Sequence, residues 1–288
     1  MSQMEFLIGF IILACVFCLI SICYAITHFH KVYYRLSSDK ISKPVKFVLL
    51  SDLHDKSFGK ENEKLIKAIE SEQPDAILMA GDMLTASLDR APQVAEKLCA
   101  KLAQKYSVFY GIGNHEAKQK WSKPYYKDAY EVLLQKLTEM GVTVLEDAHI
   151  TYGQTSICIY GLDLEKKYYK RGKTVSMDAD YMTQKLGEAN KEQYNILLAH
   201  NPEYFDAYAS WEADLVLSGH LHGGLIRLPW LGGLIAPSLR FFPKYDGGLF
   251  KKNGTDFIVS RGLGFHNLGL RMWNQGELVV IEILPTNE

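Results

Sequence analysis

The stretch "ADLVLSGHLHGG", residues 213–224, joins an apolar run to two histidines and three glycines. The apolar run predicts a buried strand that ends near residue 218. Glycine has no Cβ, so the backbone after this strand can turn sharply and approach a small bound group closely. His220 and His222 are therefore candidate ligands for such a group.

Similar apolar runs recur along the chain and predict further strands. We expect strands over 45–51, 75–80, 107–112, 155–160, 194–199, 213–218, 255–260 and 278–284. Amphipathic stretches predict helices near 60–72, 91–105, 123–140 and 202–209, the last with Asn201 as its cap and Pro202 in its first turn. Apolar runs that alternate with amphipathic segments indicate an α/β fold with strands buried on both faces. The polar stretch 163–193 is predicted to be an excursion from the sheet.

Side chains that can bind a metal ion or take part in catalysis follow five of these strands. They are Asp52 and His54, Asp82, Asn114 with His115 and Glu116, His200, and His220 with His222. In open α/β sheets ligands bind beyond the carboxyl ends of the strands, so we expect these residues to meet at one edge. In each Asp-x-His and His-x-His pair we expect both side chains to point the same way, as on an extended strand end.

The donor set indicates a binuclear metal centre. Two carboxylates, four imidazoles and one amide oxygen suit manganese, iron or zinc, of which we favour manganese, and suit calcium poorly. Seven ligands are too many for one ion, whereas two divalent ions bridged by one carboxylate and a hydroxide would use them all. Such a pair binds the attacking and leaving oxygens of a displacement at phosphorus.

The five blocks D-x-H, GD, GNH[DE], a lone H and GHxH occur here in that order. The pattern resembles the calcineurin-like metallophosphoesterases over about residues 45–284. The resemblance implies a four-layer α/β/β/α sandwich and a role for each residue in the blocks. It places Asp52, His54 and His222 on one metal ion, Asn114, His200 and His220 on the other, Asp82 between them, and His115 over the site as the general acid. Either Glu116 or Asp52 is expected to orient the His115 ring.

The later segments "IRLPWLGGLIAPS", "FFPKYDGGL" and "SRGLG" resemble the membrane-anchored bacterial branch of that family. This branch is similar to enzymes that split the pyrophosphate of UDP-2,3-diacylglucosamine, so a lipid-linked phosphoester or pyrophosphate is one expected substrate. A general phosphodiesterase or monoesterase is an alternative, and a non-catalytic metal-binding scaffold at the membrane is another. A nuclease is disfavoured, because a formal net charge of −1 gives no basic field to attract nucleic acid.

Residues 6–26 carry no charge and are long enough to form one transmembrane helix. The basic residues of the flank after it are Lys31, Arg35, Lys40, Lys43 and Lys46. The positive-inside rule places this flank, and the domain that follows it, in the cytoplasm. We therefore expect a membrane anchor and basic linker over 1–44 and a phosphoesterase domain over 45–288. A cleaved signal peptide is disfavoured, because the leader "MSQME" contains no basic residue.

Three further features leave alternatives open. Asn114, Arg261 and His266 are candidate substrate contacts, although loop residues such as His266 are often only exposed. The stretch "EKKYYKRGK", 165–173, is either a solvated loop or a grip for a phosphate head group. The apolar, glycine-rich segment 225–243 is either buried as core, which we favour, or lies near the bilayer.

Overall fold

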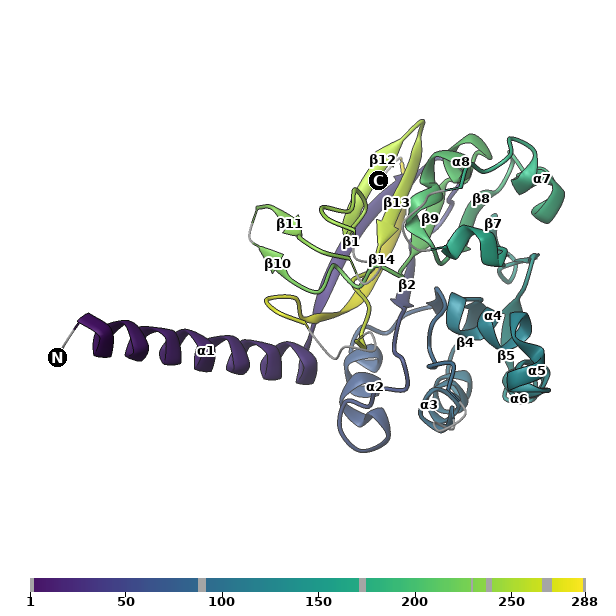
Figure 1. The fold of residues 1–288 in the computed structure, drawn as a ribbon. Helices are drawn as coiled ribbons and strands as arrows, with labels where there is room; N and C mark the ends of the chain where they lie inside the picture. The colour runs from purple at the N-terminus through teal and green to yellow at the C-terminus, as the bar shows by residue number, and fades with distance from the viewer. Residues whose placement is uncertain are drawn as a thin grey trace.

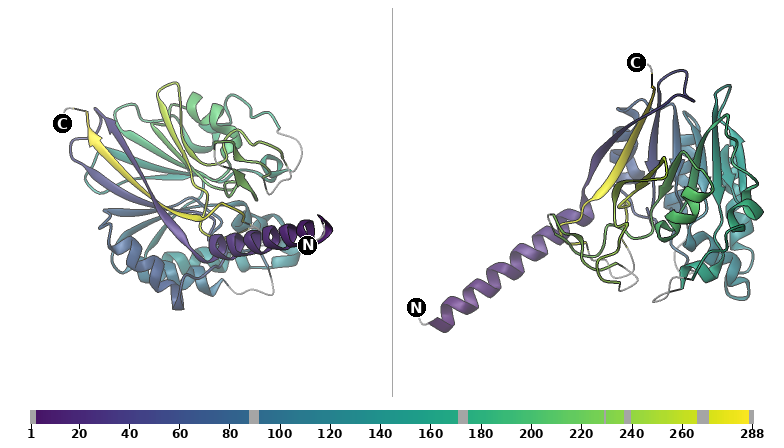
Figure 2. Two further views of the ribbon diagram at one scale, coloured as in Figure 1. Left: turned by 90° about the vertical axis from the view of Figure 1, so that its left-hand side faces the viewer. Right: turned by 90° about the horizontal axis from the view of Figure 1, so that it is seen from above.

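The structure, a computed structural model, describes residues 3–87, 92–170, 175–228, 230–236, 240–265 and 271–286. Within these residues two six-stranded sheets pack face to face, with helices on both outer faces (Figures 1 and 2). The predicted four-layer α/β/β/α sandwich is confirmed. A helix that is long and apolar enough to cross a membrane, α1 (Gln3–Thr27), extends away from the sandwich.

The first sheet has the strand order β1-β14-β2-β3-β4-β5. Its strands are β1 (Phe29–Ser38), β14 (Gly276–Pro285), β2 (Val45–Leu50), β3 (Ala76–Met79), β4 (Ser107–Gly111) and β5 (Val142–Leu145). The run from β2 to β5 is parallel, and β14 lies antiparallel to β2. The helical segments along this half are η1 (Lys60–Asn62), α2 (Glu63–Glu70), α3 (Gln93–Ala103), α4 (Asn114–Trp121), α5 (Lys123–Tyr126) and α6 (Ala129–Glu139).

The second sheet has the order β12-β13-β9-β8-β7-β6. Its strands are β12 (Gly248–Lys252), β13 (Thr255–Val259), β9 (Leu215–Ser218), β8 (Tyr194–Ala199), β7 (Ile157–Leu162) and β6 (Ala148–Thr151), and a short ladder joins β10 (Arg227–Leu228) to β11 (Gly232–Gly233). The four central strands are parallel. The helical segments are η2 (Lys166–Tyr169), α7 (Tyr181–Leu186), η3 (Pro202–Tyr204) and α8 (Phe205–Ser210).

Alternate residues of one strand belong to different cores. Phe47 and Leu49 of β2 point into the core between the sheets, whereas Val48 and Leu50 join the core under the helices. Both faces of the strand are therefore apolar, which is why the sequence shows continuous apolar runs. All eight predicted strands are present, and the Asn201 side chain accepts a hydrogen bond from the Glu203 amide, as its predicted role as a cap requires.

The prediction of a linker between the membrane segment and the domain is wrong for residues 29–38. These residues form β1, which pairs along its whole length with β14 and is separated from α1 only by His28. Two basic residues of the predicted linker are in ion pairs, Lys31 with Glu72 and Arg35 with Glu282. The apolar helix therefore continues almost directly into the first sheet.

The favoured prediction that segment 225–243 is core is correct only in part. Leu225 and Ala236 are buried, but Trp230, Leu231 and Phe241 are exposed. The predicted helix over 123–140 is broken into α5 and α6, because Lys127 adopts a left-handed backbone conformation with φ of 54°. The predicted excursion over 163–193 contains only η2 and the short helix α7 in its described part.

Candidate metal centre

The carboxyl ends of β2, β3, β4, β8 and β9 meet between the two sheets, and the predicted site residues follow these ends. The structure brings them together in three overlapping groups, which are Asp52, His54 and His222; His54, Asp82 and His115; and Asp82, His200 and His220. Within each group the potential ligand atoms lie within 4.8 Å of one another. The predicted convergence of distant segments is thus present.

Asp82 lies between the two predicted ligand groups. Its Oδ2 atom is 3.2 Å from His200 Nε2 and 3.8 Å from His54 Nε2. On the other side, Asp52 Oδ1 is 3.4 Å from His222 Nε2. Two ligand atoms that share one tetrahedral ion at bond lengths near 2.0–2.1 Å are separated by about 3.4 Å. The spacing therefore fits side chains that share metal ions.

Asn114 supplies a second test of whether a cation fits. Its Oδ1 atom is buried and has no hydrogen-bond partner within the described part of the chain. A buried amide oxygen without a donor costs about 1–3 kcal/mol, so it needs a partner of another kind. The mixed nitrogen and oxygen donor set and this oxygen together fit a divalent metal centre.

The ligand pairs converge through tight turns, and the expectation that they lie on extended strand ends is wrong. Asp52 and His54 both have φ of 50°, while His220 and His222 have φ of 72° and 52°. The strands end before these pairs begin, at Leu50 and Ser218. Left-handed backbone at non-glycine residues costs about 1–3 kcal/mol each and collects at functional sites.

The loops that carry the ligands also position one another. The Asp52 amide donates to the Gly81 carbonyl at 3.0 Å, and the His54 amide donates to the Asp82 carbonyl at 3.2 Å. A Cβ on Gly113 would collide with Asp82. A Cβ on Gly219 would likewise collide with the Asp52 carboxylate. At these two positions glycine is required because two ligand loops pack directly against each other.

Burial and charge perturb the ionisable ligands strongly. Burial raises the pKa of Asp52 to about 6. Burial opposes ionisation of Asp82, but the nearby His200 and His115 outweigh it and hold the pKa of Asp82 well below its usual range. Burial likewise opposes protonation of His200, yet the Asp82 carboxylate raises the pKa of that imidazole to about 10. Bound divalent cations would replace such protons, because metal ligands must be deprotonated.

The hydrogen bonds of two histidines define which ring nitrogen faces the centre. His200 Nδ1 lies 2.7 Å from the Ala80 carbonyl, to which it donates, so Nε2 is left as the ligand atom. His115 Nδ1 accepts from the Ala86 amide at 2.9 Å, so a neutral His115 carries its proton on Nε2. Burial lowers the pKa of His115. The Ala86 amide orients this ring, and the expectation that Glu116 or Asp52 does so is wrong.

Glu116 instead fixes the loops of the first sheet. Its carboxylate accepts hydrogen bonds from the amides of Asp82 (2.9 Å), Met83 (2.9 Å) and Gly113 (3.0 Å), and from the Tyr110 hydroxyl (2.7 Å). Burial, followed by the charge of Asp82, raises the pKa of Glu116 to about 7. Glu116 thus holds the Asp82 loop against the start of α4.

Tyr169 is a site residue that sequence reasoning did not single out. Its ring centroid is 5.3 Å from that of His220 and 6.3 Å from that of His200. Its hydroxyl oxygen is buried without a hydrogen-bond partner among the described residues. The only signal in the sequence was the aromatic pair within 165–173, the described part of which forms η2 beside the metal centre.

Arg261, a predicted substrate contact, makes its polar contacts away from this cluster. The Arg261 Nε atom donates to Glu277 Oε2 at 2.7 Å, and the guanidinium also contacts His30 at 2.7 Å. Arg261 lines a cavity beside α1, and its contact with a substrate stays a prediction. His266 lies outside the described residues. The third predicted contact, Asn114, begins α4 at the centre.

Comparison with known proteins identifies the family. Residues 45–224 match the family model of the calcineurin-like phosphoesterases, so the chain belongs to this family. Uncharacterized metallophosphoesterases of Helicobacter pylori strain 26695, Campylobacter jejuni and Bacillus subtilis (YkuE) are similar, with identities of 28%, 30% and 29%. The alignments cover 87%, 84% and 84% of this chain and 62%, 60% and 80% of those proteins.

The chain thus spans about three fifths of the length of the Helicobacter and Campylobacter relatives. The family match, the two-sheet fold and the clustered histidines and aspartates agree with one another. Residues 45–224 belong to a metal-dependent phosphoesterase domain, and the cluster around Asp82 is its divalent metal centre.

Proposed function

We propose that this protein is a membrane-anchored phosphohydrolase that uses two divalent ions to cleave a phosphoester or pyrophosphate bond of a lipid-linked substrate. The observation that carries the proposal is the position of the Asp82 carboxylate, which lies within 3.8 Å of His54 on one side and 3.2 Å of His200 on the other. A carboxylate in this position can serve two ions at once.

Each ion would have its own ligand set. Asp52, His54 and His222 would hold one ion, and Asn114, His200 and His220 the other, with Asp82 shared. When bound, manganese, iron or zinc ions supply a hydroxide nucleophile at neutral pH and stabilise charge on the phosphoryl oxygens. The chain therefore needs no serine or cysteine nucleophile.

His115 would serve the leaving group. The Ala86 amide fixes its Nδ1 as an acceptor, so Nε2 is the nitrogen that can donate to a phosphoryl or leaving oxygen. The His115 amide donates to Asp82 Oδ1 at 2.7 Å, which ties the position of this histidine to the shared carboxylate. A neutral imidazole so placed can hydrogen-bond the leaving oxygen through its Nε2–H, and it can act as a general acid only once Nδ1 also carries a proton in place of the Ala86 hydrogen bond.

The apolar helix α1 supports the choice of a lipid-linked substrate. A protein anchored by this helix meets substrates of the bilayer at high local concentration, and UDP-2,3-diacylglucosamine is one candidate. The basic residues after α1 favour a cytoplasmic domain. If protease added outside intact cells digests the domain, this orientation is wrong.

The full-length chain in detergent with manganese provides the test. We expect hydrolysis of p-nitrophenyl phosphoesters or of a UDP-linked lipid, and a loss of at least about 10³-fold in Asp82→Asn, because metal ions contribute several kcal/mol to the transition state. The control is His149→Ala, an exposed histidine on β6 far in sequence from the site, which should keep full activity.

Two rival functions are outcomes of the same experiment. Tight binding of two metal ions without hydrolysis of any ester in a broad panel would favour the non-catalytic scaffold. Cleavage of DNA or of soluble diesters in preference to lipid-linked substrates would favour the nuclease or general phosphodiesterase.

A further inference from the structure

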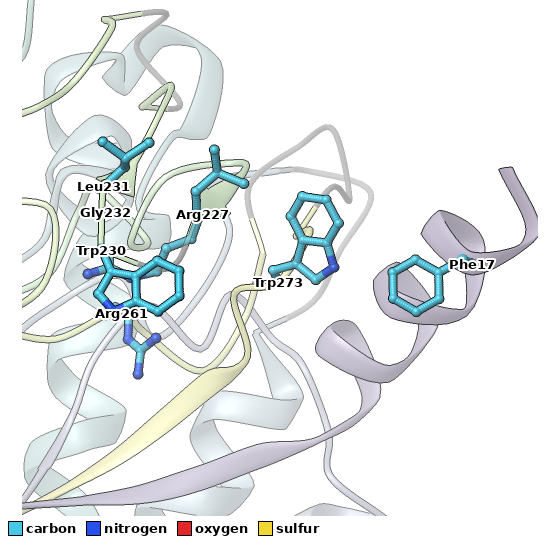
Figure 3. A pocket seen from close by; sticks show the side chains of 8 residues that line it. Phe17, Arg227, Trp230, Leu231, Gly232, Arg261 and Trp273 are labelled. Carbon is cyan, nitrogen blue, oxygen red and sulfur yellow. The ribbon is translucent and has the colours of Figure 1, made fainter. Parts of the chain in front are cut away.

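A cavity of about 800 Å³ lies between α1 and the loops near β10 and β11. Figure 3 shows Trp273 between Phe17 on α1 and the pair formed by Trp230 and Leu231. The remaining lining residues are Arg227, Leu228, Gly232 and Arg261. We call Phe17, Trp230, Leu231 and Trp273 the apolar surface.

The apolar surface is largely exposed. Trp230 is fully exposed at 102%, Leu231 is 65% exposed and Trp273 is 43% exposed. Removing apolar area from water lowers the free energy by about 25 cal/mol for each square ångström, so covering this surface with an apolar partner is favourable. Contiguous exposed patches of this kind mark interaction sites.

The position of α1 indicates what covers the apolar surface. Only His28 separates α1 from β1, and β1 pairs with β14 over ten residues, so the end of the helix is held against the first sheet. Phe17 lies ten residues before Thr27, or about 15 Å along the helix. The 25-residue helix is about 37 Å long, whereas the hydrocarbon core of a bilayer is about 30 Å thick.

With this length of α1, the cavity would lie at the membrane boundary. If the excess length of α1 lies on the side of the domain, Phe17 sits roughly 5–10 Å inside the hydrocarbon, which is the depth of interfacial segments. Tryptophan is the residue that prefers this boundary, since its ring is apolar and its N–H is polar. The two arginines at the cavity are in ion pairs with Asp246 and Glu277, so the lining adds little net charge.

We infer that the apolar surface inserts into the leaflet that α1 enters, and that membrane lipid fills the cavity. The inference rests on the proposed anchoring through α1 and adds a second membrane contact made by the catalytic domain itself. That contact fixes the domain against the bilayer, whereas a helix alone would leave it free to tilt.

The test uses the full chain reconstituted into vesicles of phosphatidylcholine brominated in the acyl chains, with tryptophan fluorescence as the readout. Bromine quenches only tryptophans that reach the acyl region. We expect quenching in the unaltered protein, loss of the quenched component in Trp230→Phe/Trp273→Phe, and its retention in Trp121→Phe/Trp211→Phe. Trp211 is buried under the second sheet and serves as the matched control.

The outcomes separate this inference from the anchoring on which it rests. Protein that does not float with the vesicles overturns both. Protein that floats with no quenching, or with equal quenching in the two double variants, overturns only the apolar-surface inference. Self-association that disappears in Trp230→Ser/Trp273→Ser, without quenching, would assign the surface to a second copy of the chain. The variants at Trp230 and Trp273 should keep full activity toward a soluble p-nitrophenyl ester in detergent.

Discussion

On the side of the first sheet, the loops of the metal centre converge on a buried carboxylate, whereas on the side of the second sheet they converge on a buried guanidinium. Glu116 accepts amide hydrogen bonds from the Asp82 loop and from Gly113. Arg271 donates to the carbonyls of Arg261 (2.6 Å), Gly262 (3.2 Å), Gly264 and Asn274 (2.8 Å).

The difference follows from which backbone groups each loop leaves unpaired. The loop after β3 and the start of α4 present N–H groups, and helix starts always do so. The turns after β13 present carbonyls, which need a donor, and Arg271 also reaches the His222 carbonyl at 3.4 Å. Burial lowers the pKa of Arg271 only to about 10, so it stays charged at neutral pH. The side of each sheet therefore uses one buried ionisable side chain, Glu116 or Arg271, to order several backbone groups around the ligands.

The largest effect is expected from Arg271→Met, which removes the donor to the carbonyls of Arg261, Gly264 and Asn274, whereas Gly262 keeps the Glu277 amide and His222 keeps the Asn274 side chain. We expect the free energy of unfolding to fall by at least about 3 kcal/mol, because each unsatisfied buried group costs about 1–3 kcal/mol. Arg271→Lys keeps the charge but reaches fewer carbonyls, so its loss should be intermediate. Thermal unfolding followed by circular dichroism measures both.

Arg35→Met is the matched control, since Arg35 is exposed and pairs with Glu282 on the neighbouring strand. Its loss should stay under about 1 kcal/mol, as for other surface ion pairs. Equal melting temperatures for Arg271→Met and Arg35→Met would show that the Arg271 guanidinium does not stabilise the loops on the side of the second sheet. The comparison between the two sides would then fail.

Glu116→Gln sharpens the comparison, because we expect this change to weaken metal binding, whereas Arg271→Met lowers the free energy of unfolding. Glutamine keeps the shape of the side chain but turns an NH₂ group toward amide donors that need an acceptor. Loss of a partner that orients a metal ligand typically lowers metal affinity about 10–100-fold, and we expect the manganese affinity of Glu116→Gln to fall by about that factor. Isothermal titration with manganese measures it. The control is Glu131→Gln, an exposed residue of α6 paired with Lys123. Unchanged manganese affinity in Glu116→Gln would contradict the role assigned to this carboxylate.

Apolar runs mark buried strands, so they predicted the α/β fold, and the convergence of the ligands followed because Asp52, Asp82 and His200 each come after such a run. The four-layer sandwich was implied by the family resemblance. The sequence could not predict that the backbone of the ligand pairs is left-handed, because packing between loops distant in sequence imposes that conformation. Nor could it predict that Arg271 donates to backbone carbonyls, because these partners leave no pattern of side chains. The strand β1 was missed because its basic residues resemble a linker until their partners, Glu72 and Glu282, are known.

The smallest effect is expected at Tyr169, on the side of the centre formed by the second sheet. Its ring packs against His220, and its buried hydroxyl has no hydrogen-bond partner in the described part of the chain. We expect this hydroxyl to donate to a phosphoryl oxygen of the substrate. Tyr169→Phe should then lower kcat/KM about tenfold, the effect of losing one hydrogen bond of about 1.4 kcal/mol, with the bound metal unchanged.

The adjacent tyrosine of η2 offers a control with the same chemistry. Tyr168 also has a buried hydroxyl, but its ring packs against Tyr181 and Tyr204, away from the ligands. Tyr168→Phe should therefore leave kcat/KM unchanged. If Tyr169→Phe instead lowers activity by releasing metal, the tyrosine supports the His200 and His220 ligands and does not contact the substrate. Glu116 would then position the ligands on the side of the first sheet, and Arg271 and Tyr169 together would position those on the side of the second sheet.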